Sequence, residues 1–216
     1  MSDVSRHDAL IDALGAELTP VRRLLPPWVR TVGWLAVVAI VAAMMLSHYG
    51  AETMLRRWHA APDLGVAALG AVLTAITASL AAFALAVPGR SSKWVWLPVP
   101  SALLWIGASG MGCLRAHIPG MHVLDMHGAN DCLIFIISLS VPLSGLLIWL
   151  LRRACPLRPV LTAVVVGLAS ASASACLLEI IHNVDAAASD LLMHALAVAI
   201  VIGVNALMGG RLLSRA

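Results

Sequence analysis

Charged side chains are scarce in this sequence of 216 residues, because Asp, Glu, Lys and Arg together make up only 12% of it. A soluble domain usually has about 25%. Six stretches contain none of these four residue types, namely 31–49, 64–87, 94–114, 132–151, 159–178 and 191–210. Each has about the 20 residues that a helix needs to cross a bilayer. A small soluble bundle cannot bury six such runs, so the sequence predicts an all-α integral membrane bundle of six transmembrane helices over residues 31–213.

Several motifs are also missing, and their absence narrows the function. No charged residue lies deep in a predicted span, which argues against a pump or an ion-coupled transporter, because buried charges mark the ion path in such proteins. The sequence has no Cys-x-x-Cys, no His-Glu-x-x-His and no recognisable nucleophile–base pair. We therefore expect no enzyme. A small metal or solute transporter that uses outer histidines and acids remains the alternative function.

The few basic residues are unevenly distributed between the two sides of the predicted bundle. With residues 1–30 in the cytoplasm, eleven of the 14 Lys and Arg lie inside: Arg6, Arg22, Arg23, Arg30, Arg90, Lys93, Arg152, Arg153, Arg158, Arg211 and Arg215. Because cytoplasmic loops are enriched in Lys and Arg, both termini are predicted to be cytoplasmic. Five tryptophans are predicted to anchor helices at the inner boundary: Trp28, Trp34, Trp94, Trp96 and Trp149. Attraction to anionic lipid explains the net charge of +3 without a nucleic-acid partner.

The segment 1–30 is the only sizeable cytoplasmic piece. Leu10, Ile11, Leu14 and Leu18 recur at helical spacing, which predicts a short amphipathic helix that Pro20 ends. Such a short helix is marginal alone in water, so its apolar stripe needs a lipid surface or a protein groove to pack against. Its polar face carries mainly acids, whereas membrane-surface helices favour Lys and Arg, and this favours a protein partner. Arg22 and Arg23 are either an ordinary flank of the first span or further partner contacts.

Histidines and acids gather on the predicted outer side. The histidines are His48, His59, His117, His122, His127, His182 and His194, and the acids are Glu52, Asp63, Asp125, Asp131, Glu179, Asp185 and Asp190. Zinc and similar ions prefer imidazole, carboxylate and thiolate ligands. Glu179 with His182, and Asp190 with His194, are spaced to share a helix face. The candidate sensing or metal-binding residues are Cys132, Asp131, His127, Glu179, His182, Asp190 and His194, although a single histidine is more often just an interfacial polar residue.

Cys113, Cys132 and Cys176 also lie toward the outer side. Cys132 follows Asp131 at the expected water boundary, where we expect a reachable thiol, so it is the first candidate for a reactive or metal-sensing residue. In an oxidising compartment it could pair with Cys113 or respond to an oxidant. Small thiols also simply pack between helices, and we prefer that interpretation for Cys176.

Five segments resemble the NrsF family of bacterial membrane anti-sigma factors: LIDAL at 10–14, LTPVRRLLPP at 18–27, AVPGR at 86–90, LRRACPLRP at 151–159 and GRLL at 210–213. The resemblance covers nearly the whole chain, including the number and spacing of the spans. It implies a protein of the bacterial inner membrane whose segment 1–30 holds an extracytoplasmic-function sigma factor. A periplasmic stimulus would release this factor in a stress response.

Family members are associated with outward cysteines, and the chain departs from that pattern. Cys132 lies where the first is expected, whereas the hairpin between the last two spans offers His182 in place of a second. A switch made of two thiols is therefore not expected. A mixed site of cysteine, histidine and carboxylate for a divalent transition metal such as zinc becomes the more plausible sensor.

Overall fold

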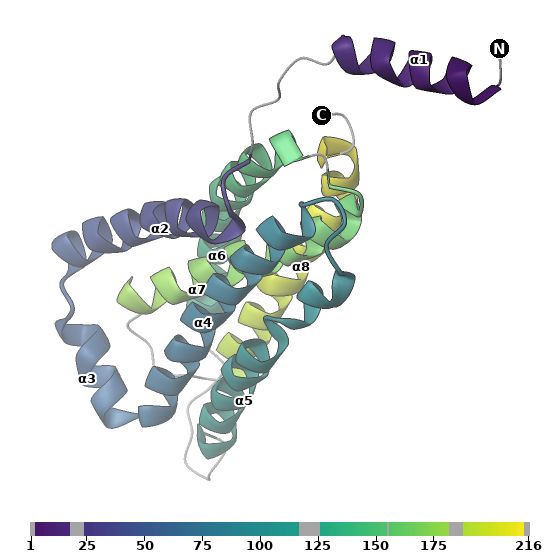
Figure 1. The fold of residues 1–216 in the computed structure, drawn as a ribbon. Coiled ribbons are helices and arrows are strands. Elements are labelled where there is room, and N and C mark those ends of the chain that lie inside the picture. The colour runs from purple at the N-terminus through teal and green to yellow at the C-terminus, as the bar shows by residue number, and fades with distance from the viewer. Residues whose placement is uncertain (1–2, 18–23, 117–125, 155, 182–187, 214–216) are drawn as a thin grey trace.

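The computed structural model describes residues 3–17, 24–116, 126–154, 156–181 and 188–213. Within these ranges the regular structure is entirely helical, as predicted, and no strand occurs in them. The elements follow one another (Figure 1) as α1 (Asp3–Ala16), α2 (Pro27–Tyr49), α3 (Glu52–Ala60), α4 (Pro62–Leu85), η1 (Ser92–Trp96), α5 (Val99–Ala116), α6 (Met126–Leu151), η2 (Arg152–Ala154), α7 (Pro159–Ile181) and α8 (Ala188–Leu213).

Five helices in the described ranges are long and apolar enough to cross a membrane: Pro27–Tyr49, Pro62–Leu85, Asn130–Ala154, Pro159–Ile181 and Leu192–Gly209. They correspond to five of the six predicted spans. The third predicted span, 94–114, is not among them and is not one continuous helix. It begins as η1, and Pro98 and Pro100 follow; because proline has no N–H to donate, it is compatible only with the first turn of the next helix. At about 1.5 Å per residue, the 18 residues of α5 extend for about 27 Å.

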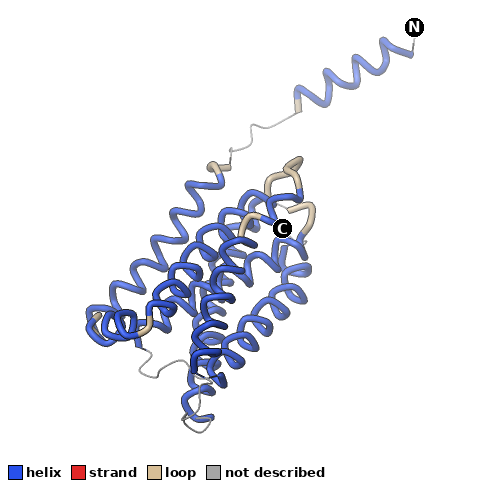
Figure 2. Tube along the Cα trace, turned by 90° about the horizontal axis from the view of Figure 1, so that it is seen from below, coloured by secondary structure: helices blue, strands red, loops and turns tan. Residues whose placement is uncertain are grey.

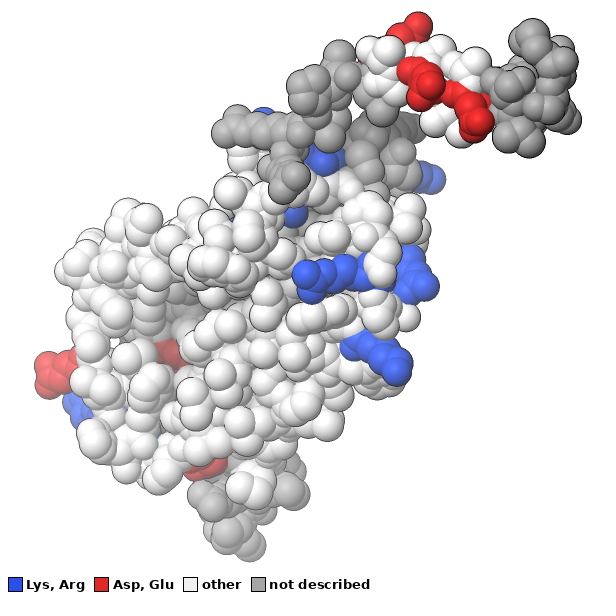
Figure 3. Space-filling view, in the orientation of Figure 1, with Lys and Arg blue, Asp and Glu red and all other residues white. Residues whose placement is uncertain are grey.

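The long helices alternate in direction, so alternate helix ends meet (Figures 1 and 2). Arg30 at the start of α2 donates a hydrogen bond to the carbonyl oxygen of Leu150 at the end of α6. Its guanidinium also lies 4.5 Å from the ring centroid of Phe83, near the end of α4. We call this end of the bundle the basic end, because it holds Arg30, Arg90, Lys93, Arg152, Arg153, Arg158 and Arg211. Figure 3 shows most of the visible Lys and Arg toward the part of the molecule where the C-terminus lies.

The core is formed around α7, whose small residues allow neighbouring helices to approach closely. Its run from Gly167 to Ala175 is buried at every position except Leu168. A Cβ atom on Gly167 would lie 2.8 Å from the Cα atom of Ile202 in α8. On α4, a Cβ atom on Gly70 would lie 2.7 Å from the backbone nitrogen of Trp105 in α5. These glycines set how close the helix axes are.

Helix α2 packs on the bundle mainly through its first turns. Its buried residues are Thr31 and Trp34, whereas Val37, Ile40 and Met44 farther along are exposed. The indole Nε1 of Trp34 donates to the carbonyl oxygen of Leu143, 3.2 Å away in α6. The prediction that Trp34 is an interfacial anchor is therefore wrong: the ring is fully buried in the core. The reason is the early start of α2 at Pro27, a residue whose fixed φ suits a first helical turn, which places Trp34 two turns inside the helix.

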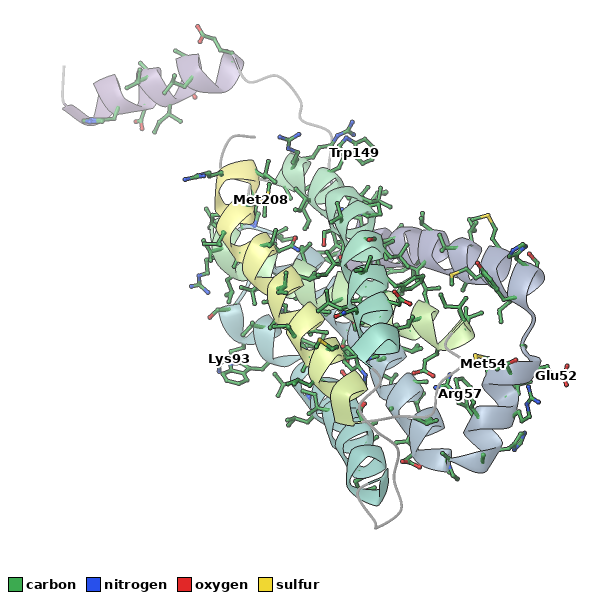
Figure 4. The ribbon with its side chains drawn as sticks, turned by 180° about the vertical axis from the view of Figure 1, so that it is seen from behind. Glu52, Met54, Arg57, Lys93, Trp149 and Met208 are labelled. Atoms are coloured by element: carbon green, nitrogen blue, oxygen red, sulfur yellow. The ribbon has the colours of Figure 1, made fainter. Side chains whose placement is uncertain are left out.

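Helix α3 lies between the first two predicted spans, in a region for which the sequence predicts no span. It begins at Glu52 and ends at Ala60, directly before Pro62 opens α4. Figure 4 shows Glu52 at the outer edge of α3 and Arg57 on the side toward the bundle. Because α3 has only nine residues and several of them are charged, it contains no hydrophobic run from which a span could be predicted. It lies at the end opposite the basic end, which we call the far end.

Candidate functional site

The predicted partner-binding stripe lies on α1. The side chains of Leu10, Ile11 and Leu14 are 57%, 65% and 57% exposed, and Figure 1 shows α1 apart from the bundle. Leu18, Arg22 and Arg23 lie outside the described residues. Moving a large aliphatic side chain from water into an apolar contact contributes roughly 1.5–3 kcal/mol. Burial of these three side chains against a partner would therefore contribute substantially to the free energy of binding.

The predicted sensing residues that the structure describes lie at the far end, and two of them come together there. Glu179 and His194, both half-buried, line one cavity. Asp131 is exposed at the start of α6. His127 lies in α6 and Asp190 in α8, but their side chains, and all of His182, lie outside the described residues. Among the residues that are described, no group of three or more His, Cys, Asp and Glu is placed to hold a metal ion.

Cys132 is not where the sequence placed it. Its side chain is 3% exposed and belongs to a buried cluster with Ile136, Ala175, Leu178 and Ala197. The expectation of a water-reachable thiol is therefore wrong. The reason is that α6 begins at Met126, six residues before the predicted span, so Cys132 lies well inside the helix and faces α7 and α8.

Arg57 is the far-end residue that sequence reasoning did not select. Its side chain is 9% exposed, and its Nη1 atom lies 3.6 Å from Oε2 of Glu179, whose side chain is 23% exposed. This ion pair connects α3 to the last turn of the central helix α7. The sequence offered one signal: Arg57 is among the few basic residues on a side that is otherwise rich in acids. No neighbouring residue in the sequence indicated which acid forms the ion pair with Arg57.

The cavity at the far end has a volume of about 380 Å³ and lies between α4, α5, α7 and α8. It is lined by Arg57, Leu64, Ala67, Ala68, Ala71, Ala102, Trp105, Ile106, Ser109, Leu168, Ala175, Glu179, His194, Ala195, Val198, Ala199 and Ile202. Ligand pockets are typically about 300–1,000 Å³ and mostly apolar with a few polar groups. This cavity fits that description, since its polar side chains apart from Ser109 are Arg57, Glu179 and His194.

Two pairs of neutral polar side chains are hydrogen-bonded across helix contacts, and neither pair lines that cavity. Asn205 of α8 donates to Ser144 Oγ of α6 at 3.1 Å and to the carbonyl oxygen of Val201 at 2.8 Å. Ser140 of α6 donates to Ser174 Oγ of α7 at 3.0 Å. Within the described spans these groups connect helices, so they do not form the polar path that the transporter alternative requires.

Comparison with known proteins gives one family. A family model described as negative regulator of sigma F, NrsF, matches residues 14–214. No curated protein and no solved structure matches the chain. The match includes the described span helices and reaches into α1 at Leu14. The chain therefore belongs to the NrsF family of negative regulators of a sigma factor.

Proposed function

We propose that this protein is a membrane anti-sigma factor that holds an extracytoplasmic-function sigma factor at the bacterial inner membrane through residues 1–30. The observation that carries the proposal is the exposed stripe of Leu10, Ile11 and Leu14 on a helix joined to a membrane bundle, in a family that regulates a sigma factor. An amphipathic helix inserted into a groove of its partner is a recurrent mode of peptide recognition. In this mode the stripe would cover the surface that the sigma factor needs for polymerase.

The proposed topology has six crossings with both termini in the cytoplasm. Besides the five long apolar helices, we count α5 as a crossing. It packs beside α4 through Gly70 and Trp105. Its length of roughly 27 Å nearly equals the hydrocarbon thickness of about 30 Å. An even number of crossings returns the chain to its starting side. Arginines and lysines of the basic end mark that side as cytoplasmic. Reporter fusions after residues 5 and 125 should then report opposite compartments, and a common compartment would refute this topology.

The proposed stimulus acts at the far end, in the periplasm. A ligand or oxidant there must prefer one of two bundle states, because equal affinity for both shifts nothing. Moving the sigma-bound fraction from 99:1 to 1:99 needs about 5.5 kcal/mol of differential affinity. For a metal such as zinc, the described residues offer Glu179 and His194 in one cavity, but they do not by themselves complete a four-ligand site.

Contacts at the basic end could transmit movement of the bundle to the segment that carries α1. Residues 1–30 join α2, and α2 is fixed to α6 by Arg30 with Leu150 and by Trp34 with Leu143. A tilt of α6 against α7 would therefore move the start of α2. Movement at this point changes the position of the segment that leads to α1.

The tethering proposal is tested by co-purification of the sigma factor with the full-length protein from membranes. Leu10→Asp with Leu14→Asp should weaken binding at least about 100-fold, because two buried leucines of roughly 1.5–3 kcal/mol each are lost. The matched control is Ala9→Asp with Ala16→Asp, which adds the same charge on the opposite side of α1 and should retain binding. Sigma activity that is unchanged by deleting residues 1–20 would contradict the proposal.

Sensing is tested separately with a reporter of the sigma regulon. Strains carrying Cys132→Ser or His182→Ala are compared with the native strain, each with and without added zinc, and the 1–20 deletion serves as the fully released reference. Substitution of a sensing residue should abolish induction of the reporter by zinc while leaving repression without zinc intact. If both variants respond to zinc as the native protein does, neither residue is the metal sensor.

A further inference from the structure

The far-end cavity has the depth of roughly one membrane leaflet. At about 1.5 Å per residue, its wall follows α7 for about 16 Å from Glu179 to Leu168 and α8 for about 12 Å from His194 to Ile202. The hydrocarbon core of a bilayer is about 30 Å thick. The cavity therefore extends from the outer boundary about halfway across it.

Most of the wall is formed by small apolar side chains, with a single aromatic ring. The alanines that line the cavity are Ala67, Ala68, Ala71, Ala102, Ala175, Ala195 and Ala199. Trp105, Ile106 and Leu168 add larger apolar surface. The alanine-lined part of the wall offers water no hydrogen-bond partners from its side chains. A flexible hydrocarbon chain matches both its shape and its chemistry.

Three polar side chains that line the cavity lie at helix ends of the far end, and we call this part of the cavity its mouth. Arg57 and Glu179 form an ion pair there, and His194 lines the cavity from α8. Arginine only donates hydrogen bonds, an ionised glutamate only accepts them, and a neutral histidine does both. The mouth therefore suits a headgroup that donates and accepts at once.

The charge at the mouth decides what kind of headgroup fits. Arg57 and Glu179 already balance each other. A charged headgroup would draw one partner to itself and leave the other uncompensated in a poorly hydrated site, which is strongly unfavourable. A hydroxyl or amide headgroup can accept from Arg57 and donate to Glu179 without separating them.

We propose that the far-end cavity binds an uncharged single-chain amphiphile, with its hydroxyl or amide headgroup at Arg57 and Glu179 and its chain along the alanine-lined wall. The bound chain bridges α4, α5, α7 and α8, so its occupancy changes the packing of the far end. Binding is a property of the purified protein and does not depend on a sigma factor. Failure of the binding test and failure of the tethering test are thus separate results.

The test uses the full-length protein in lipid nanodiscs. The probe is a medium-chain 1-monoacylglycerol with a photoreactive diazirine at the end of its chain, and unlabelled monoacylglycerol serves as competitor. We expect saturable labelling of cavity residues on α7 and α8. Labelling that the competitor does not reduce, or that bilayer phospholipid displaces equally well, would overturn the proposal.

Two substitutions on one helix provide the matched comparison. Ala199→Phe fills the cavity and should weaken labelling at least about tenfold, whereas Val204→Phe adds bulk to an exposed position of α8 that does not line it and should leave labelling unchanged. Ala195→Leu, nearer the mouth, is the second cavity-filling variant if Ala199→Phe does not fold. Equal labelling of a folded cavity-filling variant and the native protein would refute the site.

The headgroup assignment is tested by removing one charge at a time. The competitors are a fatty acid and an alkyltrimethylammonium ion of the same chain length. The native protein should prefer the monoacylglycerol to both. Glu179→Gln should raise the affinity for the fatty acid, and Arg57→Gln should raise that for the ammonium, each by at least about tenfold. If the ion pair were purely structural, these substitutions would not change which charged competitor binds better. Preference of the native protein for either charged competitor over the monoacylglycerol would overturn the assignment.

Discussion

The indole nitrogen of Trp34 in α2 donates to the carbonyl oxygen of Leu143 in α6 at 3.2 Å. Most of α2 beyond this point has no comparable anchor, since its buried residues are Thr31 and Trp34. This hydrogen bond and the one from Arg30 to Leu150 therefore hold the start of α2 to α6.

Trp34→Phe removes this hydrogen bond and keeps most of the ring. A net loss of about 0.5–1.5 kcal/mol in the free energy of unfolding is expected, with some further loss for the smaller ring. Thermal unfolding of the purified protein in detergent measures it. Trp28→Phe is the control, because Trp28 is 63% exposed; an equal effect of both substitutions would mean that the hydrogen bond does not stabilise the fold.

The ion pair of Arg57 and Glu179 should show measurable coupling. Exposed pairs contribute about 0.2–1 kcal/mol, and breaking a buried pair costs about 3–5 kcal/mol. The partial exposure of Glu179 places our expectation at about 1–2 kcal/mol in a double-mutant cycle of Arg57→Met and Glu179→Gln. Arg56→Met, at the exposed neighbouring position, should show no coupling to Glu179→Gln, and a coupling as large as that of Arg57 would argue against a specific pair.

Gly167 should not tolerate even a methyl group. Its Cβ atom would lie 2.8 Å from the backbone of Ile202, so Gly167→Ala must separate α7 from α8 at a cost of about 1–3 kcal/mol, typical of overpacking. At Gly203 a Cβ atom would meet nothing within 4 Å. Gly203→Ala is therefore expected to leave stability unchanged or raise it slightly, by up to about 1 kcal/mol. Similar losses at both positions in thermal unfolding would contradict the close contact at Gly167.

The burial of Cys132 predicts slow reaction with thiol reagents. A variant that keeps Cys132 as its sole cysteine, with serine at the other three positions, should resist a membrane-impermeant maleimide until the protein is unfolded. The comparison is the same variant with Cys132→Ser and Asp131→Cys, which moves the thiol to the exposed neighbouring position and should react readily. Rapid labelling of Cys132 in the folded protein would show that α6 opens at this point.

Much of the fold and part of the site followed from local sequence patterns. The uncharged runs located five spans because hydropathy and length are local properties, and the spacing of Leu10, Ile11 and Leu14 marked a stripe that is exposed in α1. Pro98 and Pro100 are local features too, but hydropathy alone does not show that they divide the third predicted span into η1 and α5. Glu179 and His194 were identified as candidates, although their meeting in one cavity was not.

The sequence by itself determined the helical class, the spans that five uncharged runs predict and the family, because these depend on residues that are neighbours along the chain. Only the tertiary structure decided that Arg57 pairs with Glu179, that Cys132 is buried and that four helices line a cavity at the far end. These features join positions far apart in sequence. Their geometry depends on how closely α7 and its small residues let the other helices approach.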